Sequence, residues 1–433
     1  MEQTRQLLDF LDGSPSCYHA AENVRRALLA AGFEQLWESS SWHLTPGRDY
    51  FTVRGDSSVI AFRAPQGAFS GFMIAAGHSD SPTFKVRETA EVPGPGGLLR
   101  LSVEPYGGMA MRSWLDRPLS VAGRAMVREG GRIVSRLVNV DRDLLVIPGV
   151  AIHMDREMNK GTALKANVDM LPLLAQGGEP GGFRRLIAES AGAAEANLLS
   201  TELFLYPRTR GTVTGLNGEF IAAPRLDDLQ CVFGCLQGFL AAEAGGGMPV
   251  LAVFNNEEVG SGTRQGADST FLTDVLERAA GGLGATGEAY RRLLAGSFLV
   301  SADNAHAIHP AHPEYADNNE FPVLNGGVVV KYNAAQRYTT DAVSDAVFRA
   351  VCARAGVPVQ RYSNRADLPG GSTLGNISTA HLSIPSVDIG LPQLAMHSAC
   401  EVAGVRDTDY LIRAMTAYFG CGLRVGPEGV ELL

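Results

Sequence analysis

Short apolar runs alternate with segments of helical periodicity along most of the chain. This alternation predicts an α/β fold in which helices cover both faces of a mixed sheet. Two helices are expected within residues 4–31, because Gly13, Ser14 and Pro15 interrupt an otherwise helical pattern. Apolar runs bounded by turn residues predict strands at residues 50–53, 59–63, 71–76, 250–254, 298–301, 327–333, 357–361 and 383–388. Helical spacing predicts helices at residues 227–243, 269–280, 341–355 and 408–419.

The pattern of apolar and polar residues changes between residues 86 and 224. Short apolar runs separated by turns predict strands at residues 98–103, 119–128, 132–140, 201–207 and 215–221. Residues 165–197 are rich in Ala and Gly and have little periodicity. With 433 residues, the chain is long enough for two domains. We therefore expect a discontinuous α/β domain, residues 1–85 and 225–433, interrupted by a mostly β domain at residues 86–224.

Two adjacent glutamates, Glu257 and Glu258, follow the strand expected at residues 250–254, in the sequence NNEEVG. The C-terminal end of such a strand is the edge of an α/β sheet where ligand sites are usually built. Neighbouring residues of an extended segment point in opposite directions. One carboxylate can therefore bind a metal while the other faces a water and a substrate. A solvated acidic loop is the alternative interpretation of this segment alone.

Four further segments place metal-binding types of side chain at the end of a predicted strand or in the turn after it. In addition to the two glutamates, these segments contribute His78, Asp80, Asp227, Asp228, Asp303 and His397. Two imidazoles and several carboxylates without a thiolate suit zinc or a similar divalent ion. Taken singly, each residue has an ordinary explanation. Asp227 and Asp228, for example, could simply begin a helix, where carboxylates satisfy free N–H groups.

Composition and charge exclude several classes of protein. Hydrophobic content of 45% and charged content of 19% are typical of a soluble globular protein. A net charge of −9 argues against a nucleic-acid or anionic membrane surface, which needs clustered basic residues. No apolar stretch approaches the roughly 20 residues of a membrane span, and residues 1–5 lack a signal pattern. The six scattered cysteines suggest no disulfide framework, so we expect a reduced, cytoplasmic protein.

Five short motifs occur in an order that resembles the aspartyl aminopeptidase family of dinuclear zinc exopeptidases. They are GHSDSP at 77–82, PRLDD at 224–228, NEEVG at 256–260, SADNAH at 301–306 and QLAMHS at 393–398. The sequence KYNAAQRY at 331–338 also resembles the family. The inserted segment at 86–224 matches the family's dimerisation domain, though its sequence is less diagnostic. The resemblance implies dimers that assemble into a tetrahedral dodecamer.

The resemblance also implies a role for each matching residue. Asp227 would bridge two divalent metals, most simply zinc, with cobalt or manganese as alternatives. One metal would also be held by His78 and Asp303, and the other by Glu258 and His397. Glu257 would be the general base that activates the water between the metals. Asp80, two residues after His78, can accept the second ring N–H of that histidine and fix its tautomer.

Two more residues are expected to contact the substrate. The resemblance places Lys331 near the substrate, although a solvated strand lysine is the ordinary alternative. The family's counterpart of His153 reaches the active site of a partner subunit, where it steadies the substrate or the tetrahedral intermediate; a surface histidine is the alternative. An acidic substrate needs a local cation, which Lys331 or an arginine near residues 365–367 would supply. The implied activity is release of N-terminal Asp or Glu from peptides.

Some features leave alternatives open. The chain has Gly370 where relatives often carry Cys, and Asp228 where many carry Asn, so the preference of the pocket is not fixed. His306, His309 and His312 are spaced by three, but intervening prolines prevent a helical metal tract. An aminopeptidase for apolar N-terminal residues, a dinuclear zinc deacylase and a carboxypeptidase are alternative enzymes. A non-catalytic carrier that keeps the metals structurally is another, against which the intact Glu257 argues.

Overall fold

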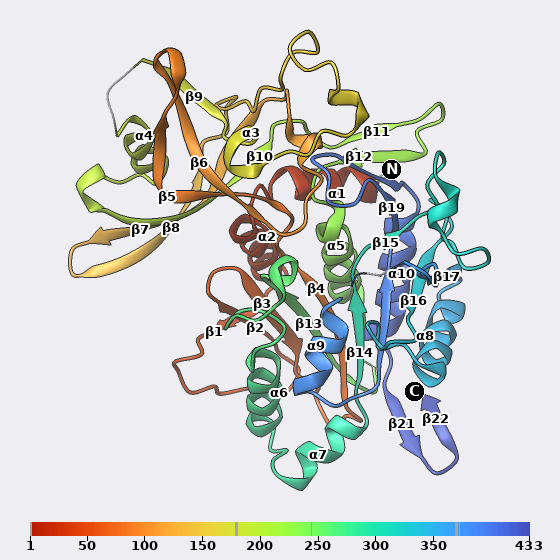
Figure 1. The fold of residues 1–433 in the computed structure, drawn as a ribbon. Helices are drawn as coiled ribbons and strands as arrows, with labels where there is room; N and C mark the ends of the chain where they lie inside the picture. Colours follow the sequence, from red (N-terminus) through yellow and green to blue (C-terminus); the bar gives the residue numbers. More distant parts are fainter. Residues whose placement is uncertain (1, 178–180, 244, 369–370, 372) are drawn as a thin grey trace.

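The computed structural model describes residues 2–177, 181–243, 245–368, 371 and 373–433. The structure is a mixed α/β fold built around two large sheets. Figure 1 shows the smaller of them lying above a larger, helix-flanked sheet. Within the described ranges, none of the helices has the length and apolar character that a membrane span needs.

The larger sheet has nine strands in the order β1-β2-β3-β13-β4-β14-β18-β16-β17. Its four central strands, from β13 to β18, are parallel, and β4 and β13 are buried along their whole length. Buried apolar strands of this kind are typical of parallel sheets covered on both faces. The bounds are β1 Glu34–Leu36, β2 Asp49–Arg54, β3 Ser58–Arg63, β4 Phe72–His78, β13 Met248–Phe254, β14 Phe298–Ala302, β16 Val328–Tyr332, β17 Val359–Ser363 and β18 Ser386–Gly390.

Helices cover both faces of this sheet. One apolar core joins the sheet to α2, α5, α8 and α10, and a second core joins the opposite face to α6, α7 and α9. Residues of α5 are buried on nearly every side, as expected for a helix packed between the sheet and other helices. The bounds are α1 Glu2–Asp12, α2 Cys17–Ala30, α5 Leu226–Ala241, α6 Phe271–Gly282, α7 Glu288–Ala295, α8 Ala342–Arg354, α9 Leu374–His381 and α10 Asp407–Phe419.

The smaller sheet is antiparallel and has six strands in the order β8-β7-β10-β5-β6-β9. It has a core of its own, which includes Phe84, Trp114, Leu203 and Ile187. The bounds are β5 Thr83–Pro93, β6 Leu98–Tyr106, β7 Leu119–Glu129, β8 Arg132–Asn139, β9 Leu173–Gln176 and β10 Leu198–Pro207, with helices α3 Ala166–Asp169 and α4 Gly182–Ser190.

A third sheet joins residues that follow β10 to residues near the C-terminus. Its order is β11-β12-β20-β19-β15, with β12 antiparallel to β20. The bounds are β11 Thr212–Thr214, β12 Phe220–Ala223, β15 Ala305–His306, β19 Pro392–Leu394 and β20 Glu401–Gly404, and a hairpin of β21 Leu423–Gly426 and β22 Gly429–Leu432 is separate. Short 3-10 helices occupy Pro95–Gly97, Met111–Trp114, Met158–Lys160, Glu195–Asn197, Glu257–Val259 and Pro313–Tyr315.

The structure differs from the sequence expectation in a few elements. The strand expected at residues 215–221 is mostly a turn, because Gly215 and Gly218 have positive φ values of 100° and 71° and reverse the chain. Residues 165–197, which lacked a clear pattern, contain α3, β9 and α4. The long strand β5 was not expected, because its outer half, from Arg87 onward, is polar and largely exposed.

Candidate metal centre and active site

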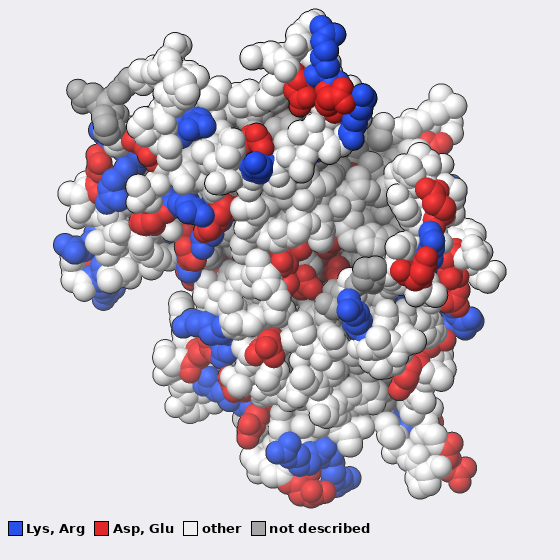
Figure 2. All heavy atoms as spheres, viewed as in Figure 1, with Lys and Arg blue, Asp and Glu red and all other residues white. Residues whose placement is uncertain are grey.

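Three parallel strands end at one edge of the nine-stranded sheet, and this edge carries the candidate site. Strand β4 ends at His78, β13 ends at Phe254 and β14 ends at Ala302, and Phe254 pairs with His78. Because ligand crevices of α/β sheets lie outside the C-terminal ends of parallel strands, residues that follow these ends meet there. The structure brings Glu257 and Asp303 to His78 in this way. Figure 2 shows acidic side chains gathered in a hollow in this region.

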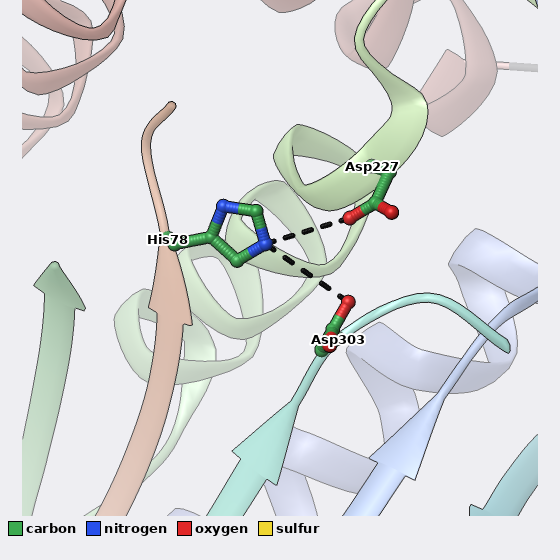
Figure 3. Close-up of side chains that lie close together, drawn as sticks. All are labelled: His78, Asp227 and Asp303. Atoms are coloured by element: carbon green, nitrogen blue, oxygen red, sulfur yellow. Dashed lines mark ion pairs between the residues drawn. The ribbon is translucent and has the colours of Figure 1, made fainter. Parts of the chain in front are cut away.

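The first group of side chains consists of His78, Asp227 and Asp303, all buried. His78 Nε2 lies 3.5 Å from Asp227 Oδ1 and 4.0 Å from Asp303 Oδ1. Figure 3 shows the three side chains pointing toward one another from the end of β4, the start of α5 and the end of β14. Sequence reasoning named all three residues, which lie up to 225 positions apart in the chain.

The second group consists of Asp227, Glu258 and His397. His397 Nε2 lies 3.3 Å from Asp227 Oδ2 and 3.5 Å from Glu258 Oε2. Asp227 therefore presents one carboxylate oxygen to each imidazole. In each group, the potential ligand atoms all lie within 4.8 Å of one another. The five predicted metal ligands thus converge, with Asp227 shared between the two groups.

Unpaired buried oxygens test whether these residues suit a metal. Asp227 Oδ1 and Glu258 Oε1 are buried and have no hydrogen-bond partner among the described residues. Buried polar atoms are nearly always paired, so such oxygens suit the binding of a cation. Imidazole and carboxylate ligands without a thiolate fit zinc, and a carboxylate shared by two groups fits a two-metal site. The donor set is therefore compatible with the divalent ions that the sequence predicted.

Electrostatics in the metal-free protein support the same conclusion. Burial opposes ionisation of Asp227, but the nearby imidazoles of His397 and His78 hold its pKa below the ordinary value. Burial disfavours a charged His397, yet Asp227 and Glu258 raise its pKa to about 10. The pKa of Glu258 is raised well above its usual value by burial and by Asp227. These shifts show that the buried negative charge of this cluster depends on nearby positive charge, which a divalent cation would also supply.

Glu257 lies beside the two groups on the short 3-10 helix Glu257–Val259. It lines a pocket of about 250 Å³ together with His78, Asp227, Asp303 and His397. Burial raises the pKa of Glu257 to about 7, and nearby Asp303 contributes to this shift. A carboxylate with a pKa near neutrality can accept and return a proton at physiological pH. The predicted general base therefore lines the same pocket as four of the predicted metal ligands.

Asp80 is buried next to the 3-10 helix Glu257–Val259, and its contact with His78 differs from the one expected. His78 Nδ1 is 3.0 Å from the main-chain oxygen of Asp80 and 3.5 Å from its carboxylate Oδ1. The shorter contact fixes the tautomer of His78, so the main chain of Asp80 does what was expected of its side chain. The carboxylate instead accepts the N–H groups of Glu257 and Glu258, each at 3.2 Å, and the hydroxyl of Tyr106 at 2.7 Å.

Glu401 is a site residue that sequence reasoning missed. Its Oε2 accepts the main-chain N–H of Asp227 at 3.0 Å, and its Oε1 accepts the N–H of His397 at 2.7 Å. The ring Nδ1 of His397 lies 2.7 Å from the main-chain oxygen of Gly108, which directs Nε2 toward Asp227. Glu401 acts only through main-chain N–H groups and Gly108 only through its main-chain oxygen, so neither residue type nor spacing gave a signal for them.

Lys331 is buried on β16, which excludes the alternative of a solvated strand lysine. Its Nζ lies 3.6 Å from Asp303 Oδ2 and 5.4 Å from the centre of the Tyr338 ring. Burial disfavours the charge, but Asp303 raises the pKa of Lys331 above its usual range. The same pocket includes Tyr338, Tyr362 and Thr373. A charged ammonium therefore lies in the wall of the pocket.

The chain departs from the family pattern at two positions, Gly370 and Asp228. Gly370, with Pro369 and Ser372, lies outside the described residues. Asp228 is fully buried, and its Oδ2 accepts the main-chain N–H of His78 at 3.0 Å. Burial raises the pKa of Asp228 well above its ordinary value. Asp228 therefore supports the strand end that carries His78 and does not line the pocket.

His153 is exposed and lies in an irregular segment that follows the six-stranded sheet's strand β8. It does not line the pocket described above. Ile152 and Met154 on either side are also exposed, the latter by 83%. Within one subunit, the structure therefore does not bring His153 together with the other predicted site residues.

Comparisons with known proteins agree with the motifs. A protein-family model described as Aminopeptidase I zinc metalloprotease (M18) matches residues 10–419. A probable M18 family aminopeptidase 2 of Clostridium acetobutylicum is 40% identical over 427 residues, covering 97% of this chain and 99% of the relative. A protein of the same description from Pseudomonas aeruginosa is 40% identical over 426 residues, covering 96% of this chain and 98% of the relative.

Solved structures are similar over nearly the whole chain. A chain in the cryo-EM structure of the Ape4 and Nbr1 complex has a TM-score of 0.93 and 34% identity, covering 96% of this chain and 85% of that chain. A chain of the S. cerevisiae mApe1 dodecamer has a TM-score of 0.85 and 26% identity, covering 96% of both chains. An M18 aminopeptidase of Thermotoga maritima shares the fold, with a TM-score of 0.84 and 21% identity.

Proposed function

Because this chain belongs to the M18 family of zinc aminopeptidases, the aspartyl aminopeptidase family that its motifs predicted, we propose that it releases N-terminal Asp or Glu from peptides. The observation that carries the proposal is the position of Asp227, which faces an imidazole on each of its oxygens. Glu257 lies in the same pocket and belongs to neither of the two groups that share Asp227. This arrangement supports the proposal of a two-metal site with a separate base.

The proposed metal ligands follow the two groups. His78 and Asp303 would hold one divalent ion, Glu258 and His397 would hold the other, and Asp227 would bridge them. Such ions supply Lewis-acid polarisation of the peptide carbonyl and make water more acidic. Zinc is the family's metal and suits the ligand types. Occupancy by two ions is part of the proposal.

Glu257 would move the proton during hydrolysis. Its carboxylate is proposed to accept a proton from the attacking water and to return it to the leaving amine nitrogen. Asp80 is proposed to position this base, because it accepts the N–H groups of both Glu257 and Glu258. The main-chain oxygen of Asp80 and that of Gly108 orient the rings of His78 and His397.

Lys331 supports the preference for an acidic N-terminal residue. A buried ammonium in the pocket wall is the cation that an Asp or Glu side chain would meet. The rings of Tyr338 and Tyr362 line the same pocket, and charges attract each other more strongly where such side chains replace water. An apolar N-terminal residue would leave the ammonium without a second carboxylate besides Asp303. This argument favours acidic over apolar substrates.

The proposal extends to domain organisation and assembly. Residues 1–85 and 225–433 would form the catalytic domain, and residues 86–224 would form an inserted dimerisation domain. A relative with 26% identity forms a dodecamer. We propose that this chain also self-associates into dimers and a dodecamer, in which His153 reaches the site of a neighbouring subunit. The exposed side chains of His153 and Met154 are available for such a contact.

A substrate comparison tests the proposed activity. The zinc-loaded protein is assayed with aspartyl-anilide, leucyl-anilide, N-acetylaspartyl-anilide and an N-terminally blocked peptide. The proposal expects the highest kcat/KM for aspartyl-anilide, because its free amino group and acidic side chain both find partners. Preference for the leucyl compound would assign the enzyme to apolar residues. Turnover of only an acylated compound would identify a deacylase, and release of a C-terminal residue a carboxypeptidase.

The variant Glu257→Gln tests the base. It keeps the size of the side chain but cannot take a proton, so we expect kcat to fall by about 10²–10⁴-fold. Zinc content, measured by mass spectrometry, should stay unchanged because Glu257 is not a proposed ligand. Glu288→Gln, at an exposed position on α7, is the matched control. Full activity of Glu257→Gln would refute the assignment.

A further inference from the structure

A buried carboxylate lies behind the pocket of the candidate site. Asp388 is in the middle of β18, is fully buried, and is not among the residues that line the pocket. It is neither a proposed metal ligand nor part of the proposed chemistry. Burying a carboxylate costs free energy unless hydrogen bonds replace those it makes with water. The partners of Asp388 therefore show which segments the carboxylate holds in place.

One carboxylate oxygen of Asp388 binds the segment that follows β16. Its Oδ2 accepts the main-chain N–H of Thr339 at 2.6 Å and the hydroxyl of the same residue at 2.9 Å. The hydroxyl of Ser386, also on β18, donates to that of Thr339 at 2.7 Å. Tyr338 precedes Thr339 and lines the pocket, and the centre of its ring lies 5.4 Å from Lys331 Nζ. The bonds to β18 therefore fix the main chain next to Tyr338.

The other carboxylate oxygen binds the start of α9. Oδ1 of Asp388 accepts the hydroxyl of Thr373 at 2.5 Å, and Thr373 immediately precedes α9 and lines the pocket. A Cβ atom at Gly375 would lie 2.5 Å from the same oxygen, so glycine lets the first turn of the helix approach the carboxylate. Helix α9 lies beside β14 (Figure 1) and packs against β18. Asp388 therefore fixes the start of α9 against the sheet.

The two segments that Asp388 binds form two walls of one pocket. Tyr338 belongs to the segment after β16, and Thr373 to the start of α9. The pocket between them also contains Lys331, whose ammonium is the proposed partner of an acidic side chain. The separation of the walls decides how closely a substrate side chain approaches this ammonium and how much water stays beside it. Charges attract each other more strongly where water is excluded.

We propose that Asp388 is a positioning residue, which fixes two walls of the pocket and so sets the preference for an acidic N-terminal residue. The inference rests on the proposed aminopeptidase activity and adds a residue that determines its specificity. Asp388 does not touch the substrate and acts through the hydroxyls of Thr339 and Thr373. Loss of either hydroxyl should therefore weaken the binding of an acidic side chain more than that of an apolar one.

Substitutions at Thr373 test one wall and leave Asp388 and its charge in place. Thr373→Val removes the hydroxyl and keeps the shape of the side chain, whereas Thr373→Ser keeps the hydroxyl and loses only a methyl group. The zinc-loaded variants are assayed with aspartyl-anilide and leucyl-anilide. We expect Thr373→Val to raise KM for aspartyl-anilide by about 5–10-fold, which corresponds to the loss of about one hydrogen bond. Its kcat and its kinetics with leucyl-anilide should stay nearly unchanged, and Thr373→Ser should keep the wild-type preference.

Substitutions at Thr339 test the other wall from outside the pocket. Thr339 does not line the pocket, so its hydroxyl affects the substrate only through Asp388 and the adjacent Tyr338. Thr339→Val should show the same selective rise in KM, and Thr339→Ser should prevent it. Thr379→Val is the matched control, because the hydroxyl of Thr379 lies on α9 but donates to main-chain oxygens of that helix. This control should keep the wild-type preference.

A binding measurement separates this inference from the proposed function. Free aspartate, a product of the proposed reaction, is titrated by calorimetry into the zinc-loaded wild-type protein and each variant, with leucine for comparison. Weaker binding of aspartate but not leucine in both valine variants, restored in the serine variants, supports the inference whether or not peptides are cleaved. Failure of the wild-type protein to cleave aspartyl-anilide would instead refute the proposed function.

The remaining outcomes overturn the inference. Zinc content and thermal unfolding show whether each variant is loaded and folded. In such a variant, an equal loss on both anilides, no change on either, or a fall in kcat with unchanged KM would contradict the role of Asp388. A serine variant that behaves like its valine counterpart would contradict it as well. If Thr373→Val does not fold, Thr339→Val, at a partly buried position, carries the test.

Discussion

At the scale of single residues, the site depends on how Asp227 and His397 are held. Glu401 accepts one main-chain N–H from each of them, so one side chain fixes the spacing of two proposed ligands. Glutamine at this position has only one oxygen, and its NH₂ group would face an N–H. We expect Glu401→Gln to weaken zinc binding by about 10–100-fold, which is the usual effect of losing a group that orients a metal ligand.

Competition with a chromophoric chelator measures this affinity. Glu428→Gln, at an exposed position near the C-terminus, serves as the control. If the loss is one of positioning, excess zinc restores much of the activity of Glu401→Gln. An unchanged zinc affinity in a folded variant would contradict the role given to Glu401.

Zinc affinity should also depend on pH. In the metal-free protein, neighbouring carboxylates outweigh burial and raise the pKa of His78 above its usual value and that of His397 to about 10. A raised pKa means that these imidazoles keep protons at neutral pH, whereas a metal ligand must be deprotonated. Binding therefore releases protons, and affinity rises with pH. We expect a rise of at least about tenfold per pH unit between pH 6 and 8, by chelator competition. A constant affinity over this range would contradict this protonation pattern.

At the scale of elements, the six-stranded sheet takes part in the site. Tyr106, the last residue of β6, donates to Asp80 at 2.7 Å and accepts from Asn256 at 2.8 Å. Asn256 has a positive φ of 63° and leads into the 3-10 helix that carries Glu257. One hydroxyl therefore connects a strand of the smaller sheet to the turn that presents the proposed base.

Removing this hydroxyl should weaken both stability and catalysis. Tyr106→Phe leaves the buried carboxylate of Asp80 with one partner fewer, and we expect a loss of about 1–3 kcal/mol in the free energy of unfolding. A drop in kcat/KM should accompany it, because the turn of Glu257 is less well fixed. Urea unfolding and steady-state kinetics give the two values. Tyr410→Phe on α10 is the control, and equal behaviour of both variants would contradict the link.

The sequence predicted what local pattern determines and missed what distant contacts determine. Buried strands such as β4 and β13 have continuous apolar runs, and their ends carry His78 and Glu257, so the strands and the candidate residues could be predicted. The grouping of these residues into two metal sites came from the resemblance to the family. The outer half of β5 is polar and exposed, and only pairing with β6 makes it a strand. Glu401 and Tyr106 act through main-chain N–H groups and a carboxylate of other segments, and no spacing within their own segments reveals such contacts.

At the scale of the whole molecule, the position of His153 implies that one subunit is incomplete under the proposed assembly. The residue is exposed on an irregular segment and does not line the pocket of its own chain. If it serves a neighbouring subunit, His153→Ala should lower kcat while Glu257→Gln abolishes it. Each active site would then contain Glu257 from its own chain and His153 from the neighbouring chain.

Mixing the two variants tests this directly. Subunits of His153→Ala and Glu257→Gln are combined under dissociating conditions and allowed to reassemble. In a mixed pair, the site with an intact Glu257 receives an intact His153 from its neighbour, so one site in two is complete. Random pairing makes about half of the pairs mixed and returns about a quarter of the wild-type activity. Light scattering checks reassembly, and a mixture of Glu288→Gln with Glu257→Gln, which should keep about half of the wild-type activity, shows that mixing itself does not inactivate the sites. Activity that stays at the average of the two separate variants would mean that His153 acts within its own chain or not at all.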